Sequence, residues 1–116
     1  MTRPPTTATD VDADAARRLA EGGAFLLDVR EDDEWAAGHA PDAVHIAMGL
    51  VPDQVDRIPD EQTVVCVCRV GGRSGTVAQA LAQAGYEVRN LDGGMLAWES
   101  AGLPVVTPGG DAGRII

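Results

Sequence analysis

The stretch "TVVCVCRVGGRSGTVAQALAQAG", residues 63–85, decides the fold of this chain. Residues 63–67 are mostly β-branched and apolar, which is typical of a buried strand. Two adjacent glycines follow, and Ser74 is the expected N-cap of a helix that ends at Gly85. Small and aliphatic residues recur on one face of that helix, namely Val77, Ala78, Leu81 and Ala84. The stretch therefore predicts a strand, a tight loop and a helix.

The flanking sequence repeats this alternation. Strands are predicted at 24–29, 43–46 and 88–91, and helices at 13–21 after Asp12, at 31–37, between Pro52 and Pro59, and around Trp98. Alternating strands and helices favour right-handed crossovers and a parallel sheet covered by helices on both faces. Ligands of such folds bind beyond the carboxyl ends of the strands, where the loop after residue 67 is expected.

Length and composition indicate one globular domain. The chain has 116 residues, of which 45% are hydrophobic. We expect a flexible arm at 1–9, a domain at 10–105 and a C-terminal tail at 106–116. The first ten residues lack an apolar run and no segment is long enough to cross a bilayer, so we expect a cytoplasmic protein. A net charge of −9 argues against nucleic acid or an anionic membrane as partner.

The charge distribution singles out the cysteine loop. Residues 62–86 contain no Asp or Glu, yet they carry Arg69 and Arg73 beside the two cysteines, Cys66 and Cys68. A zinc site is disfavoured, because two cysteines and two distant histidines do not have a zinc-ligand spacing. A redox pair is also disfavoured, because redox motifs usually read C-x-x-C and strand residues two apart lie about 6.6 Å from each other.

An anion-binding loop fits the pattern best. Glycines let several backbone N–H groups converge on one point, and the N-terminus of the following helix adds partial positive charge. These groups favour the thiolate of Cys68, whose pKa is expected to lie below its ordinary value. Cys66 lies inside the strand between valines and is expected to be a small buried hydrophobe.

Three ordered motifs resemble the single-domain rhodanese (sulfurtransferase) family. They are "LLDVREDDEWAAGHAPDAVHI" (26–46), "CRVGGRS" (68–74) and "LDGGMLAWESAGLPV" (91–105), and the likeness runs from about Val11 to Val105. The resemblance implies a three-layer α/β/α domain with a central, mainly parallel sheet of about five strands. It also implies transfer of sulfane sulfur from thiosulfate, or from another persulfide donor, to an acceptor such as cyanide or a thiol, with no cofactor and no metal.

The same resemblance assigns residues to roles. Cys68 matches the sulfur-carrying cysteine, and Asp28 and Arg30 match a supporting pair near the loop. His39 matches a packing position, not a catalytic base. The remaining loop residues match the substrate-binding cradle: Arg69, Val70, Gly71, Gly72, Arg73 and Ser74.

Loop length separates sulfur transfer from phosphate chemistry. Phosphatases related to this fold use C-x5-R, whereas Arg73 follows Cys68 after four residues and residue 74 is Ser. The two-domain thiosulfate enzymes tend to carry a basic residue where this chain has Glu34, which leaves a thiosulfate anion to Arg69 and Arg73. A second interpretation is a sulfur-relay module that hands the persulfide to a protein acceptor, with little turnover of free thiosulfate.

Overall fold

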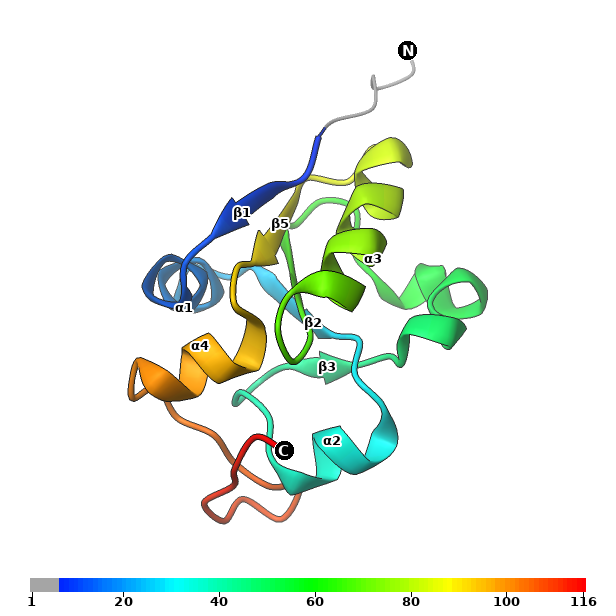
Figure 1. The fold of residues 1–116 in the computed structure, drawn as a ribbon. Helices are drawn as coiled ribbons and strands as arrows, with labels where there is room; N and C mark the ends of the chain where they lie inside the picture. The colour runs from blue at the N-terminus through cyan, green and yellow to red at the C-terminus, as the bar shows by residue number, and fades with distance from the viewer. Residues whose placement is uncertain (1–6) are drawn as a thin grey trace.

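The structure is a computed structural model that describes residues 7–116. It confirms the predicted alternation of strands and helices (Figure 1). The strands are β1 (Thr9–Val11), β2 (Phe25–Asp28), β3 (Val44–His45), β4 (Val64–Val67) and β5 (Val88–Leu91). The α-helices are α1 (Ala13–Glu21), α2 (Asp32–Ala37), α3 (Gly72–Gln83) and α4 (Gly94–Ser100), and two 3-10 helices, η1 (Met48–Leu50) and η2 (Pro52–Arg57), follow β3.

The five strands form one parallel sheet in the order β1-β5-β4-β2-β3. β4 occupies the centre, and all four of its residues are buried because helices cover both faces of the sheet. The predicted α/β class with a parallel five-stranded sheet is therefore confirmed. Among residues 7–116, no helix combines the length and the apolar character that a membrane crossing requires.

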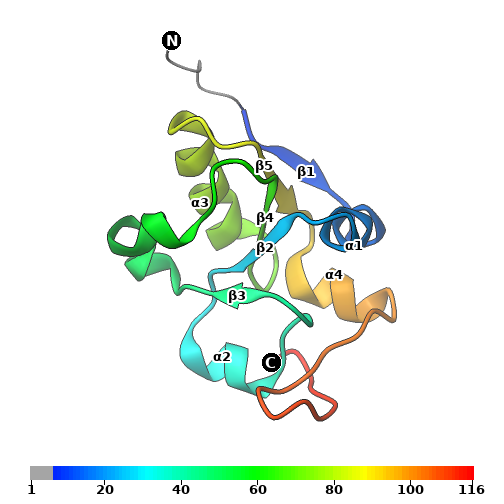
Figure 2. The same ribbon diagram turned by 180° about the vertical axis from the view of Figure 1, so that it is seen from behind.

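Helix α3 covers one face of the sheet and helices α1 and α4 cover the other (Figures 1 and 2), so the core has two layers. Val64, Cys66 and the following Cys68 belong to the layer that also contains the buried face of α3. Val65 and Val67 belong to the opposite layer, with the buried residues of α1 and α4. The two cysteines thus share one face of the sheet because strand side chains alternate with a period of two.

Strand β1 is absent from the sequence prediction. It pairs in parallel with β5, with Thr9 opposite Arg89 and Val11 opposite Leu91. Its three residues are exposed or half-buried, so no apolar run marks it as a strand. The predicted flexible arm at 1–9 therefore overlaps β1 at Thr9, and its residues 1–6 lie outside the described part of the chain.

The start of α3 differs from the prediction. Gly71, with φ of 106°, is the N-cap, and the Gly75 amide donates to the Gly71 carbonyl at 3.0 Å. Ser74 is consequently a residue of the first turn and not the N-cap. Glycine adopts the left-handed conformation without a steric cost. The helix therefore begins three residues earlier than an N-cap at Ser74 would place it. At the other end, Ala84 is exposed, and Ala82 is buried beside Leu81.

The segment expected as a tail, residues 106–116, folds back toward α2 (Figure 1). Val106 and His39 exchange two backbone hydrogen bonds of 2.9 Å each, and the Arg114 amide donates to the Ala37 carbonyl at 3.0 Å. Turn bonds between Thr107, Gly110 and Asp111 reverse the chain between these contacts. Glycine and proline therefore serve here as turn residues that return the chain to the domain.

Candidate active site

Cys68 lies directly beyond the carboxyl end of the central strand, as the sequence predicts. The loop 69–71 then connects it to α3, so the sulfur faces the N-terminus of that helix. The residue is 1% exposed and belongs to the core layer beneath α3. The sulfur is therefore largely shielded from solvent.

Two donors converge on the Cys68 sulfur. The Gly71 amide donates to Sγ at 3.1 Å, and the Ser74 hydroxyl donates to it at 3.2 Å. Burial alone raises the pKa of the Cys68 thiol. Hydrogen bonds from the Ser74 hydroxyl and from the amides of Ser74, Gly71 and Val70 outweigh burial, so the pKa lies below its ordinary value. The loop therefore favours the thiolate, which is the nucleophilic form.

Asn90 of β5 completes this network, and the sequence analysis did not identify it. Its Nδ2 donates to the Gly71 carbonyl at 3.2 Å, and its Oδ1 accepts from Ser74 Oγ at 2.6 Å. A hydroxyl has one hydrogen, so Ser74 donates either to Asn90 or to the sulfur at a given moment. When Cys68 loses its proton, its sulfur becomes an anionic acceptor for the Ser74 hydroxyl. Hydrogen bonds to an anion are stronger than those between neutral groups, so ionisation of Cys68 favours donation to the sulfur over donation to Asn90.

Replacing Ser74 by alanine should raise the pKa of Cys68, because it removes the Ser74 hydroxyl, which makes the largest hydrogen-bond contribution to the thiolate. The rate of alkylation by iodoacetamide, followed as a function of pH, measures this pKa. Thr76→Ala is the matched control, because Thr76 lies on the same helix and its exposed hydroxyl donates to the Gly72 carbonyl rather than to the sulfur. Equal pKa values for Ser74→Ala and Thr76→Ala would contradict the role given to Ser74.

The turn between β5 and α4 holds the other side of the loop. The Met95 and Leu96 amides donate to the carbonyls of Cys68 and Arg69 at 2.8 and 3.1 Å. Gly94 has φ of 60°, and a Cβ atom there would overlap both of these carbonyls. Position 94 therefore requires glycine for two reasons: its backbone angle is left-handed, and the Cys68 loop approaches it too closely for a side chain. The motif "LDGG" predicts a turn, but nothing in it indicates this contact.

The two loop arginines are not the free cations that the sequence suggests. Arg73 makes two hydrogen bonds to Glu34 of α2, with Nη1–Oε1 at 2.7 Å and Nη2–Oε2 at 2.9 Å. Arg69 is exposed, and its Nε donates to the Ile116 carbonyl at 3.1 Å. Binding of an incoming anion by Arg69 and Arg73 stays a prediction, and the structure shows that Arg73 is already paired with Glu34. Glu34 lies within the same site and offsets one of the two charges.

Asp28 and Arg30 form a fully buried ion pair where β2 ends next to β4. Arg30 donates from Nη2 to Asp28 Oδ2 at 2.8 Å and from Nε to Oδ1 at 3.0 Å. Nη2 also donates to the Gly38 carbonyl at 2.8 Å, whereas Nη1 has no partner among the described residues. The pair thus ties the end of β2 to the segment after α2. Neither residue bonds to the Cys68 sulfur, so a supporting role stays a prediction.

Cys66 has a different environment from Cys68. It is fully buried within β4, and burial raises the pKa of its thiol to about 12, with a smaller contribution from Cys68. Both cysteines are free thiols. The two thiols therefore have pKa values shifted in opposite directions, and their roles as nucleophile and small buried hydrophobe stay predictions.

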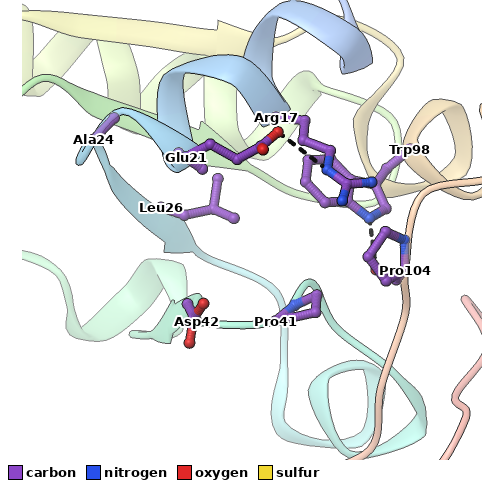
Figure 3. Close-up of a pocket in the computed structure, with 9 residues that line it drawn as sticks. Arg17, Glu21, Ala24, Leu26, Pro41, Asp42, Trp98 and Pro104 are labelled. Atoms are coloured by element: carbon purple, nitrogen blue, oxygen red, sulfur yellow. Dashed lines mark hydrogen bonds and ion pairs between the residues drawn. The ribbon is translucent and has the colours of Figure 1, made fainter.

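A cavity of about 170 Å³ lies elsewhere, between α1, the start of β2 and α4 (Figure 3). Leu26 and Trp98 line it, the ion pair of Arg17 with Glu21 borders it, and Trp98 Nε1 donates to the Pro104 carbonyl at 2.8 Å. None of its lining residues belongs to the Cys68 loop. The cavity is therefore separate from the candidate site.

The sequence is similar to a known protein family and to individual members of it. Residues 12–101 match the model of the rhodanese-like domain family. A sulfurtransferase of Allochromatium vinosum is 40% identical over 104 residues, which cover 87% of this chain and 97% of that protein. The Bacillus subtilis protein YtwF is 42% identical over 80 residues, 69% of this chain and 78% of that protein.

A solved structure has the same fold. The crystal structure of a rhodanese-related protein from Thermoplasma volcanium superimposes with a TM-score of 0.80 at 23% identity, covering 84% of this chain and 97% of that one. At this identity the structural similarity shows the fold alone. The family is shown by the sequence match, which covers residues 12–101. The chain belongs to the rhodanese-like domain family.

Proposed function

We propose that the protein is a sulfurtransferase that carries sulfane sulfur on Cys68. The donor is thiosulfate or a persulfide, and the acceptor is a thiophile such as cyanide or a thiol. The observation that carries this proposal is the pair of donors, the Gly71 amide and the Ser74 hydroxyl, on the Cys68 sulfur at the start of α3. Membership of the rhodanese-like family supports the same reaction.

The reaction has two half-reactions. The Cys68 thiolate attacks the outer sulfur of thiosulfate, the sulfur–sulfur bond of the donor breaks, and sulfite leaves with the electron pair. The enzyme then holds a Cys68 persulfide anion, which the loop amides and the first turn of α3 stabilise. Cyanide attacks the outer sulfur, thiocyanate leaves and the thiolate returns. A covalent intermediate between two substrates predicts ping-pong kinetics.

The size and charge of the loop favour a sulfur donor over a phosphoryl group as the substrate. Four residues separate Cys68 from Arg73, and Glu34 already accepts two hydrogen bonds from Arg73. A phosphoryl group needs several free donors around it, whereas a single sulfur atom needs few. The low exposure of Cys68, 1%, also suits a donor that presents one terminal atom.

Intact mass spectrometry tests the proposal directly. The protein is incubated with thiosulfate, or with the persulfide of a small thiol, desalted and weighed. We expect a gain of one sulfur atom that cyanide removes and that yields thiocyanate. A protein that is folded, reacts with iodoacetamide at Cys68 and gains no sulfur from either donor would refute the proposal.

A sulfur-relay role is the second candidate. Val70 is 55% exposed, so an apolar side chain stands at the surface two residues from the sulfur carrier. A protein acceptor that packs against Val70 would bring its own thiol close to the Cys68 sulfur. Rapid transfer to or from a persulfidated protein, together with slow turnover of thiosulfate, would favour the relay over the small-molecule enzyme. A cytoplasmic location stays a prediction.

A further inference from the structure

The contact between α2 and α3 controls the charge beside Cys68. Both carboxylate oxygens of Glu34 accept from Arg73, at 2.7 and 2.9 Å. The Glu34 side chain is 14% exposed and that of Arg73 is 36% exposed. Parallel double hydrogen bonds of this kind fix the geometry of a guanidinium as well as its charge. The pair is therefore a defined element of the site and not a loose surface contact.

Glu34 is itself held in place. Its Oε1 accepts from the Glu31 amide at 3.0 Å, in a capping box at the start of α2. Despite partial burial, hydrogen bonds from Arg73 and the Glu31 amide lower the pKa of Glu34 to about 2. The carboxylate is thus ionised at neutral pH, and an incoming anion must compete with it for Arg73.

The pairing matters for chemistry because Arg73 lies in the first turn of α3, directly before Ser74, whose hydroxyl donates to the Cys68 sulfur. With Glu34 in place, the two side chains sum to zero charge. Arg69 is then the remaining cation of the loop, and it is exposed and bonded to the Ile116 carbonyl. A thiolate with few uncompensated cations around it repels a doubly charged donor more strongly than a singly charged one.

We propose that Glu34, by neutralising Arg73, makes the site selective for sulfane donors that carry one negative charge. Organic thiosulfonates and the persulfides of thiols without other net charge are such donors, and thiosulfate, a dianion, is disfavoured. This inference rests on the proposed sulfur transfer through Cys68. With a thiosulfonate, the thiolate attacks the terminal sulfur, the sulfur–sulfur bond breaks and a sulfinate leaves, so Cys68 again becomes a persulfide anion. No oxidant or reductant is needed.

Two donors that differ by one charge test the proposal. The value of kcat/KM for methanethiosulfonate and for thiosulfate is measured at saturating cyanide, in the wild type and in Glu34→Gln. The Coulomb energy of two unit charges about 6 Å apart in water corresponds to roughly a threefold change in rate. Freeing Arg73 should therefore raise kcat/KM about tenfold for the dianion and about threefold for the monoanion.

Arg73→Gln provides the mirror experiment and remains informative if Glu34→Gln folds poorly. It leaves Glu34 as an uncompensated anion, so it should lower kcat/KM about tenfold for thiosulfate and about threefold for methanethiosulfonate. The double variant is neutral at this position and should return to the wild-type ratio. Asp33→Asn is the matched control, since it removes an exposed carboxylate from the same helix.

The outcomes separate this inference from the function on which it rests. A donor ratio that is the same in the wild type, Glu34→Gln and Arg73→Gln, or that Asp33→Asn shifts as much as Glu34→Gln, overturns the role of Glu34. If neither donor leaves sulfur on Cys68 of the folded wild type, the proposed function fails instead. An increased salt dependence of the thiosulfate rate in Glu34→Gln alone would further support the proposal.

Discussion

Cys68→Ser should abolish sulfur transfer, with a fall in thiocyanate formation of at least about a thousandfold. A serine hydroxyl has nearly the same size, but it is not ionised by the hydrogen bonds that favour a thiolate, and it forms no persulfide. Thiocyanate production measures the rate, and the intact mass after incubation with thiosulfate should show no added sulfur. A variant that still turned over at the wild-type rate would remove Cys68 from the mechanism.

Cys66→Ala is the control for this result. Cys66 is fully buried and its thiol pKa is raised to about 12, so it is not a thiolate at neutral pH. Alanine leaves a small cavity and no unsatisfied polar group, which is why it is preferable to serine at this position. Most of the activity should remain. A complete loss in folded Cys66→Ala would instead favour a redox pair of the two cysteines.

The second large effect concerns stability. Asp28→Asn should lower the free energy of unfolding by about 3–5 kcal/mol, because it leaves the fully buried guanidinium of Arg30 without a compensating charge. Nη1 of Arg30 already lacks a partner among the described residues, so the guanidinium has little alternative stabilisation. Urea unfolding followed by circular dichroism gives the change.

The exposed ion pair of Arg17 with Glu21 supplies the comparison. Their atoms lie 3.3 Å apart, but the side chains are 42% and 66% exposed. Glu21→Gln should therefore change the free energy of unfolding by less than about 1 kcal/mol. If Asp28→Asn were equally mild, the buried pair would not be the support of the β2 end that its geometry indicates.

The sequence predicts the layout of this domain well, because the buried strands are distinct apolar runs and the helices between them have clear ends. Cys68 and its loop could be predicted because strand, glycines and helix follow each other without interruption. Strand β1 escapes prediction because three residues on a sheet edge carry no apolar pattern. The predicted N-cap at Ser74 is wrong because Gly71, three residues earlier, takes the left-handed conformation and caps the helix instead.

The side chains around the sulfur are harder to predict. Glu34 and Arg73 are 39 residues apart, and Asn90 and Ser74 are 16 apart. Local periodicity holds no information on such pairs, since they meet only once the sheet order is set. Sequence reasoning therefore identifies Cys68 as the candidate nucleophile but does not determine which charged side chains surround it.

Gly94 has a consequence for how this enzyme can be altered. Its missing side chain lets the loop that bears Cys68 rest directly on the first turn of α4, main chain against main chain. A substitution at position 94 therefore cannot widen the entrance to Cys68 without displacing this main-chain contact. New donor preferences, in nature or in the laboratory, must arise from exchanges of the surrounding side chains while the peptide path stays as it is.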